Sequence, residues 1–280
     1  LFSQVLPAHG VEVSFINLRD HDAVRAAIQP NTKGLWIETP SNPLLNIIDI
    51  AAMVDIAKET GAITMLDNTF LSPVFQKPFT LGVDVIVHST TKYINGHSDV
   101  VGGAAIGRTP ELAERLLWIA NAMGLTCSPF DAWLVLRGIK TLPHRMKAHQ
   151  ANATAIAHWL SDHPQVSKVY YTGLDSHPQR ELIARQQLGH GGMLAFEIDA
   201  PPEALDRFFA ALELFLLAES LGGVESLIEQ PWTMSHASMG EKGLGESGIT
   251  PQTIRVSVGL EHPDDLIADL QKAFDAIRTS

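Results

Sequence analysis

Three polar clusters follow apolar, β-rich runs of the sequence and contain side chains that could carry out chemistry. They are Glu38-Thr39-Pro40-Ser41-Asn42-Pro43, Asp67-Asn68-Thr69 and His88-Ser89-Thr90-Thr91-Lys92-Tyr93. An acid, an amide and a lysine with hydroxyl neighbours suit a phosphorylated, nitrogen-bearing ring. A dinucleotide would require a Gly-rich turn before a helix, and the sequence contains no G-x-G-x-x-G. The clusters therefore favour a site for a phosphorylated ring over a dinucleotide site.

Each of these residues also has an ordinary structural explanation when it is taken alone. A lysine after a strand is most often a solvated surface charge, and an aspartate there is usually a turn former or a helix cap. The hydroxyls of Ser89 and Thr91 could simply cap the end of a strand. The combination of Asp67 and Lys92 at one predicted sheet edge favours a functional site.

The first half of the chain must position these clusters, and its pattern is that of alternating strands and helices. Strands are predicted at 11–16, 34–37, 62–66, 83–88 and 103–106, with helices at 20–28 and 49–60. This order is typical of a largely parallel sheet covered on both faces, in which ligands bind at the carboxyl ends of the strands. We therefore expect the three clusters to converge at one edge of the sheet.

The second half of the chain has a different pattern, which predicts a smaller α+β domain. Residues 110–160 are mainly helical, and Pro143 is expected to break or kink the helix near Thr141 and Leu142. Further elements are predicted as strands at 165–171, 192–198 and 253–258 and helices at 202–216 and 263–277, and a glycine-rich segment at 239–248 is expected to be a mobile surface loop. A boundary near Ala148 divides the chain into domains 1–147 and 148–280.

Composition and charge limit the classes of function and partner. The chain has 280 residues, of which 45% are hydrophobic and 18% charged. This composition is typical of a folded globular protein and excludes an intrinsically disordered one. Twenty basic and 31 acidic residues give a net charge of −11, which disfavours nucleic acids and anionic membranes as partners. No apolar run approaches the ~18 residues that span a bilayer. The single cysteine, Cys127, fits a reducing compartment, so the cytoplasm is expected.

The histidines give no sign of a metal site. The chain has 12 of them but no H-E-x-x-H, and His144 and His149 are five residues apart, which is not a metal-ligand spacing on a helix. We expect no metal and a small-molecule substrate.

The clusters and several further motifs resemble the Cys/Met metabolism family of pyridoxal-phosphate (PLP) enzymes. In Ser89-Thr90-Thr91-Lys92-Tyr93 the lysine stands 25 residues after Asp67, as in that family. Further matches are Glu38-Thr39-Pro40-Ser41-Asn42-Pro43, Asn95-Gly96-His97-Ser98-Asp99, Arg137-Gly138, Ala218-Glu219-Ser220-Leu221-Gly222-Gly223 and Arg255-Val256-Ser257-Val258-Gly259. The matches extend in order over essentially all 280 residues.

The resemblance implies a fold and a cofactor. The fold would be α/β, that of a fold-type I PLP-dependent transferase, with a mainly parallel, doubly wound sheet in the large domain and a smaller α+β C-terminal domain. The cofactor would be pyridoxal 5'-phosphate, bound covalently to Lys92 through a Schiff base. Asp67 would pair with the pyridine nitrogen, and Ser89 and Thr91 would donate hydrogen bonds to the phosphate. Asn42 resembles the family asparagine that lies near both the cofactor and the substrate carboxylate.

Three residues of the second half would bind the substrate. Arg255 is predicted on an otherwise apolar strand, where a guanidinium is costly without a partner. The resemblance assigns it to the α-carboxylate of an amino acid, which a guanidinium can clamp with two hydrogen bonds. An edge-strand arginine that faces water is the alternative. Ser220 resembles the position whose backbone approaches the same carboxylate. Glu219 resembles the acid near the distal end of the substrate, or it is a solvated turn glutamate.

The family resemblance implies trans-sulfuration of sulfur amino acids. The segment from Leu214 to Leu227 is most similar to the cystathionine γ-synthase branch, which joins an activated homoserine ester to cysteine. Cystathionine γ-lyase, which eliminates cysteine from cystathionine, is the nearest alternative, followed by cystathionine β-lyase. The resemblance also implies a homotetramer, a dimer of dimers with shared active sites.

Relative to the family, the sequence begins about a third of the way in. Its first residue is Leu1, and the run Leu1-Phe2-Ser3-Gln4-Val5-Leu6 reads as part of an amphipathic helix without a cap, so we expect further residues upstream. A non-catalytic scaffold that lacks part of the cofactor site is the alternative of a different class.

Overall fold

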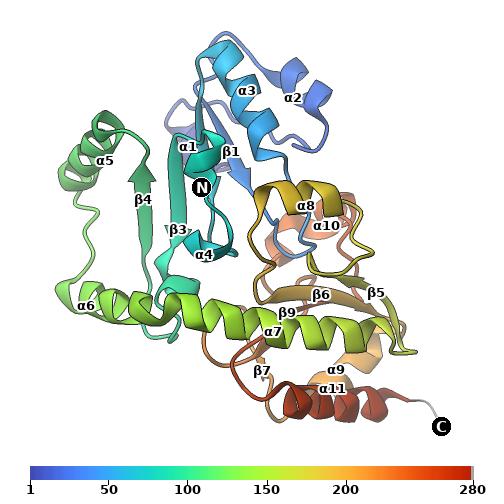
Figure 1. The fold of residues 1–280 in the computed structure, drawn as a ribbon. Helices are drawn as coiled ribbons and strands as arrows, with labels where there is room; N and C mark the ends of the chain where they lie inside the picture. Colours follow the sequence, from blue (N-terminus) through green and yellow to red (C-terminus); the bar gives the residue numbers. More distant parts are fainter. Residues whose placement is uncertain (279–280) are drawn as a thin grey trace.

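The computed structural model describes residues 1–278 and contains two sheets joined by a long helix (Figure 1). The first sheet has the consecutive strand order β1-β2-β3-β4, in which β1, β2 and β3 are parallel and β4 is antiparallel to β3. Its strands are β1 (Gly34–Glu38), β2 (Ile63–Asp67), β3 (Val85–Ser89) and β4 (Gly103–Gly107). The four predicted strands from 34 to 106 are therefore confirmed within one or two residues.

The helix α3 (Ile50–Thr60) shows why the first half folds locally as it does. The Asp49 side chain caps it by accepting a hydrogen bond from the Ala52 backbone N–H (3.1 Å). Gly61 ends it with a φ of +69°, a left-handed conformation that glycine adopts without strain. Buried Ile50, Met53, Val54, Ile56 and Ala57 pack on β1 and β2, which fixes the sheet beneath the site.

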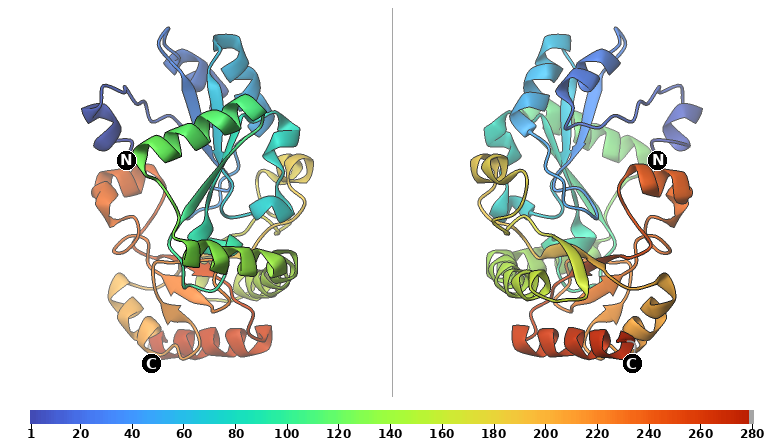
Figure 2. Two further views of the ribbon diagram at one scale, coloured as in Figure 1. Left: turned by 90° about the vertical axis from the view of Figure 1, so that its left-hand side faces the viewer. Right: turned by 90° about the vertical axis from the view of Figure 1, so that its right-hand side faces the viewer.

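The second sheet has the order β5-β6-β9-β8-β7. Its strands are β5 (Val166–Tyr170), β6 (Met193–Ile198), β7 (Leu216–Leu217), β8 (Leu227–Glu229) and β9 (Thr253–Ser257). Helices α9 (Leu205–Ala210) and α11 (Pro263–Ile277) lie on the outer side of this sheet, as Figures 1 and 2 show. Phe196, Phe208 and Phe274 are fully buried in the resulting core, so the predicted α+β layer is present.

Helix α7 (Leu142–Ser161) begins beside the turn Thr90–Ile94 that follows β3 and then runs along β5 and β6 of the second sheet (Figure 1). Pro143 lies in its first turn, where a missing N–H costs nothing, so this proline begins a helix directly after a short 3-10 turn at Ile139–Thr141. The helix continues without a break through residue 148. The strands before residue 148 belong to one sheet and those after it to the other, while the division into domains 1–147 and 148–280 stays a prediction.

The remaining helices are short or peripheral. None of the described helices combines the length and apolar character needed to cross a bilayer. The remaining helices are α1 (Val5–Ala8), α2 (His21–Ala27), α4 (Ser72–Phe75), α5 (Pro110–Met123), α6 (Pro129–Gly138), α8 (Arg180–Gln186) and α10 (Gly240–Glu246).

Three predicted elements were wrong. Residues 11–16 form no strand, because no neighbouring strand in the described chain pairs with them. The helix predicted over 202–216 ends at Ala210, because buried Asp269 accepts the backbone N–H groups of residues 213–215 and holds them outside a helix. The segment 239–248 is mostly the helix α10, whose Leu244 is buried against Leu44.

Candidate active site

The three polar clusters meet in a pocket of about 190 Å³ at the carboxyl ends of β1, β2 and β3, which confirms the prediction that they converge. Side chains from all three clusters line it, and Leu221 approaches from the second half of the chain. The lining residues are Glu38, Pro40, Asn42, Asp67, Thr69, Phe70, Ser89, Lys92 and Leu221.

Strand register and two short hydrogen bonds align the base of the pocket. Glu38 pairs with Asp67 across the parallel strands β1 and β2, so the two carboxylates leave adjacent strand ends together. The Asp67 carboxylate accepts the Thr69 backbone N–H (2.9 Å), and the Thr69 hydroxyl accepts the Ser89 backbone N–H (2.8 Å). These bonds tie the end of β2 to the end of β3 and hold the Asp67 carboxylate in a fixed direction.

Lys92 lies in a helical turn, Thr90–Ile94, that follows β3 directly. Buried Arg145 on α7 holds this turn by donating to the backbone carbonyls of Tyr93 (2.8 Å) and Ile94 (3.3 Å). The same guanidinium also donates to the carbonyl of Gly138 (3.0 Å). The sequence analysis did not identify Arg145, and its signal is weak because a helical arginine is ordinarily exposed.

The Lys92 amine is held against the loop that precedes β8. Its Nζ donates to the Ser220 hydroxyl at 3.0 Å. Gly222 allows this close approach, because a Cβ there would lie 2.7 Å from the Tyr93 backbone nitrogen. Burial and, second, the charge of Arg255 lower the pKa of Lys92, while Glu229 opposes the change. A larger fraction of the amine is therefore neutral, and the neutral amine is the form that acts as nucleophile or base.

Arg255 lies at the centre of the second sheet, because β9 pairs with β6 on one side and with β8 on the other. The edge-strand alternative was therefore wrong, and the residue is only 3% exposed. Nη1 donates to Glu229 (2.8 Å) and Asn42 (3.3 Å), while Nη2 donates to the backbone carbonyls of Glu219 (2.6 Å) and Ser220 (3.0 Å). Its Nε is buried and has no partner among the described residues. This donor is free for an acceptor from a ligand.

Glu229, like Arg145, is a residue of the site that the sequence analysis missed. It is 0% exposed, pairs with Arg255 and accepts the Ser235 hydroxyl at 2.5 Å. Burial raises the pKa of Glu229, and the Arg255 guanidinium lowers it in opposition. The argument used for Arg255 applies to Glu229 as well. A charged side chain that follows Ile228 on an apolar strand is costly to bury unless it has a partner, and this pattern is visible in the sequence.

The other predicted site residues differ in how closely they approach the pocket. The Thr91 hydroxyl is held by Gly102, whose N–H it accepts (2.9 Å) and whose carbonyl it contacts (3.3 Å), and Thr91 does not line the pocket. Ser89 does line it. Ser220 contacts Lys92, whereas the side chain of Glu219 is exposed beside the Arg255 guanidinium. Asn42 joins the pocket to Arg255.

This donor set fits pyridoxal phosphate. One pocket presents a carboxylate for a protonated ring nitrogen in Asp67, an amine with a lowered pKa in Lys92 and a free hydroxyl in Ser89. The unpartnered Nε of Arg255 supplies an additional donor nearby for a carboxylate. Among residues 1–278, no group of three or more His, Cys, Asp or Glu side chains could hold a metal ion.

Comparisons with known proteins agree with this chemistry. A family profile described as Cys/Met metabolism PLP-dependent enzyme matches residues 1–275. Cystathionine gamma-lyase of Bacillus subtilis (strain 168) is 47% identical over 277 residues, which cover 99% of this chain and 73% of that protein. Cystathionine beta-lyase of Coxiella burnetii (strain RSA 493 / Nine Mile phase I) is 47% identical over 265 residues, with 94% and 68% coverage.

The solved structures agree as well. Cystathionine gamma synthase from Xanthomonas oryzae pv. oryzae, in complex with cystathionine, superposes with a TM-score of 0.91 at 49% identity, covering 93% of this chain and 67% of that one. The shared fold is that of the fold-type I PLP enzymes. With its lysine, aspartate and buried arginine arranged in that fold, the chain belongs to the Cys/Met metabolism family of PLP-dependent enzymes and is a PLP-dependent enzyme of trans-sulfuration.

Proposed function

We propose that the chain catalyses the cystathionine γ-synthase reaction, in which cysteine replaces the leaving group of an activated homoserine ester. The observation that carries this proposal is the placement of three groups around one loop. The Ser220 hydroxyl contacts the Lys92 amine, the Arg255 guanidinium binds the carbonyls of Glu219 and Ser220, and the exposed Glu219 side chain acts on the charge of Arg255. An amine, a carboxylate clamp and a distal acid are what γ-replacement on an amino acid needs.

Arg255 and Asn42 would bind and orient the substrate. The free Nε of Arg255, with one Nη made available by a shift of Asn42, can hold an α-carboxylate through two charge-assisted hydrogen bonds. Glu219 would face the amino group of the incoming cysteine or the distal part of the substrate.

Lys92 would bind PLP covalently and then move protons. Asp67 would hold the pyridine nitrogen protonated, and Ser89, with Thr91 in a supporting role, would hold the phosphate. When bound, PLP draws the negative charge that develops at the substrate Cα into its ring. Lys92 Nζ would take the proton from Cα, transfer it to the bound cofactor, and then take one from Cβ. The bond from Cγ to the ester oxygen would break and the cysteine sulfur would bond to Cγ, while the released carboxylate takes the thiol proton. Protons would then return to Cβ and Cα through Lys92, so that the net change is the exchange of the ester group for the cysteine sulfur.

The test supplies the full-length, PLP-loaded protein with cysteine and either O-succinyl- or O-acetylhomoserine and measures cystathionine by mass spectrometry. Formation of cystathionine that is lost in Lys92→Ala supports the proposal. Matched controls are Lys92→Arg, which keeps the charge but not the base, and Lys147→Gln, an exposed lysine of α7 outside the site. An enzyme that yields no cystathionine with either ester would rule out the synthase reaction.

Cystathionine alone then separates the two lyase alternatives. Efficient release of 2-oxobutyrate would favour cystathionine γ-lyase, the reaction for which the Bacillus subtilis relative is named. Pyruvate would instead favour cystathionine β-lyase, the name of the Coxiella burnetii relative, and would remove the role given to Glu219.

The assembly that we propose is a homotetramer, a dimer of dimers with shared active sites, in the cytoplasm. Helices α5 and α6 support it, because α5 has no buried residue and α6 buries only Gly138. Figure 1 shows α5 standing at the edge of the molecule beside β4. Large exposed apolar side chains that gather on neighbouring helices mark protein interfaces. The exposed apolar side chains are Leu117, Trp118, Met123, Leu125, Phe130, Trp133 and Leu136.

Analytical ultracentrifugation tests the assembly. We expect the holoenzyme to sediment as a tetramer and the double variant Trp118→Glu/Trp133→Glu as a smaller species. Leu188→Gln is the matched control, because Leu188 is an equally exposed apolar residue away from α5 and α6. A monomeric wild-type holoenzyme, or a double variant that stays tetrameric, would contradict this role of the two helices.

A further inference from the structure

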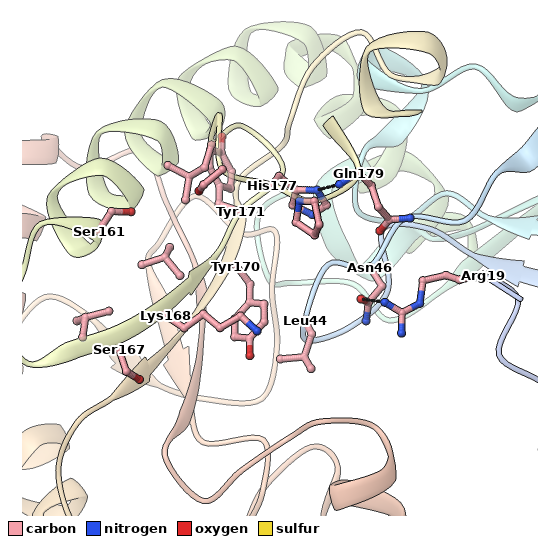
Figure 3. Close-up of a pocket in the computed structure, with 15 residues that line it drawn as sticks. Arg19, Leu44, Asn46, Ser161, Ser167, Lys168, Tyr170, Tyr171, His177 and Gln179 are labelled. Atoms are coloured by element: carbon pink, nitrogen blue, oxygen red, sulfur yellow. Dashed lines mark hydrogen bonds between the residues drawn. The ribbon is translucent and has the colours of Figure 1, made fainter. Parts of the chain in front are cut away.

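A second cavity, of about 490 Å³, lies between the two halves of the chain and outside the Lys92 pocket (Figure 3). One wall comes from β5 and the loop that contains His177, and the other comes from Leu44, Asn46 and Arg19. Its volume lies in the range of small-molecule sites, and no residue of it is shared with the lining of the Lys92 pocket. The reaction proposed above makes no use of it.

The lining of this cavity is cationic, although the whole chain carries a net charge of −11. Arg19 and Lys168 line it, and no aspartate or glutamate does. Neither cation forms a salt bridge within residues 1–278: Arg19 bonds to the amide side chains of Asn17 and Asn46, and Lys168 lies over the Tyr170 ring. His177 adds no charge near neutral pH, because burial lowers its pKa. Neither of these two exposed cations therefore has an ion-pair partner within 4 Å among the described residues. The carboxylate near Lys168 is that of Glu197, its cross-strand neighbour, which accepts the Tyr170 hydroxyl at 2.6 Å.

The two cations lie at opposite sides of the cavity with apolar surface between them. Figure 3 shows Lys168 beside Tyr170 on one side, Arg19 beside Asn46 on the other, and Leu44 between. The Lys168 amine is 4.4 Å from the centre of the Tyr170 ring, so the ring already favours a cation there. A matching ligand has an anionic group at each end and an apolar middle.

We propose that this cavity is a binding site for a small organic dianion, held by Arg19 at one end and Lys168 at the other, which regulates substrate binding at Arg255. The regulatory part rests on the proposed function.

A short series of hydrogen bonds connects the cavity to the active site. Arg19 donates to the Asn46 side chain (2.8 Å). Asn46 closes the loop 41–46 through two bonds to Ser41, one from the Asn46 N–H to the Ser41 hydroxyl (3.2 Å) and one from the Ser41 N–H to the Asn46 carbonyl (3.0 Å). The same loop carries Asn42, which accepts from Arg255. An anion that competes with Asn46 for Arg19 would loosen the loop and release Arg255 from Asn42.

Isothermal titration calorimetry of the holoenzyme with adipate, a linear dicarboxylate, tests the binding. We expect saturable binding to the wild type, binding at least 10-fold weaker to the double variant Arg19→Gln/Lys168→Gln, and none of the neutral diol hexane-1,6-diol. The loss follows from removing two charge-assisted contacts, which together are worth about tenfold or more at exposed positions. Lys147→Gln, which removes an exposed lysine of α7, should bind adipate like the wild type.

Two results would overturn the proposal. One is the absence of binding up to about 10 mM adipate. This limit would still detect a weak site, because it lies well above a Kd of about 1 mM. The other is equal affinity in the wild type and the double variant, which would mean that adipate occupies Arg255 instead. This measurement involves no turnover, so its outcome does not depend on which reaction the enzyme catalyses.

The regulatory part has its own readout. We expect adipate to change the KM of the amino-acid substrate at least threefold in the wild type, with a smaller change in kcat, and to change neither in the double variant. Binding of adipate with an unchanged KM would overturn the connection through loop 41–46 while leaving the binding site in place.

Discussion

Replacing Glu229 by glutamine is expected to destabilise the enzyme and, at the same time, to strengthen its binding of carboxylates. Glutamine has nearly the same shape and can still accept a hydrogen bond from Arg255 and from Ser235, so the change removes a negative charge and little else. The guanidinium then lies 3% exposed without a hydrogen-bonded counterion, since its other acceptors are Asn42 and two backbone carbonyls and the charge of Glu219 acts on it from an exposed position. A ligand carboxylate would supply the missing charge.

The magnitude follows from the burial of the pair. Breaking a buried ion pair by removing one partner costs about 3–5 kcal/mol, and the hydrogen bond that glutamine keeps places Glu229→Gln near the lower value. For a chain of this length the midpoint of thermal unfolding should fall by about 6 °C. Two carboxylates on opposite sides of one guanidinium, roughly 6 Å apart, repel by about 3 kcal/mol at an effective dielectric constant of 20. Removing one should tighten carboxylate binding by up to about 100-fold.

Thermal unfolding of the holoenzyme with and without propionate measures both effects, because propionate has the carboxylate but lacks the amine that reacts with the cofactor. The stabilisation by propionate should be larger in Glu229→Gln than in the wild type. Asp269→Asn is the matched control: Asp269 is a buried carboxylate that accepts three backbone N–H groups far from the pocket, so its loss should lower stability without changing the propionate effect. Equal or weaker propionate binding by Glu229→Gln would refute the reasoning.

Three further changes probe the groups around Lys92. Burial lowers the pKa of His149 to about 4, so between pH 6.5 and 4 the unfolded chain binds more protons than the folded one and the wild type loses up to about 3 kcal/mol of stability as the pH falls. The variant His149→Asn should lose less stability over the same range. Urea unfolding at several pH values measures this difference. Asp67→Asn should lower kcat by about 100-fold or more with the fold retained, which steady-state kinetics and circular dichroism measure together. Arg145→Met should lower the free energy of unfolding by about 3 kcal/mol and reduce the PLP content after dialysis, because three backbone carbonyls around the Lys92 turn lose a charged donor. Full PLP retention would contradict the role of Arg145 in holding this turn.

The elements that the sequence predicted correctly are those whose signals are local. The predicted helix 49–60 is present as α3, which Asp49 and Gly61 cap in the structure, and the polar clusters at the ends of β1, β2 and β3 had to meet because parallel strands share a direction. Asp67 and Lys92 stood out in the sequence as polar residues placed after apolar strands and Arg255 as a charged residue within one, while the roles proposed for them came from the family resemblance.

The elements that the sequence did not predict depend on distant partners. The helix from Leu205 ends early because Asp269, almost 60 residues later, binds the backbone that would have continued it. Residues 11–16 have a strand-like pattern, but a strand needs a neighbour and the described chain supplies none. Arg145 acquires its importance only because α7 lies behind the Lys92 turn, a tertiary contact that no periodicity reveals.

Helix α7 connects the Lys92 turn to the second sheet as one continuous rigid element. Its first turns hold the Lys92 turn through Arg145, and later turns hold the end of β9 through His149, which bonds to the Val258 carbonyl (2.7 Å), and Asn152, which bonds to that of Gly259 (3.0 Å). A 20-residue helix is about 30 Å long and resists bending over that span. Lys92 and the strand that carries Arg255 are thus both held by the same rigid helix. The distance between these two residues therefore stays constant when the surrounding loops move.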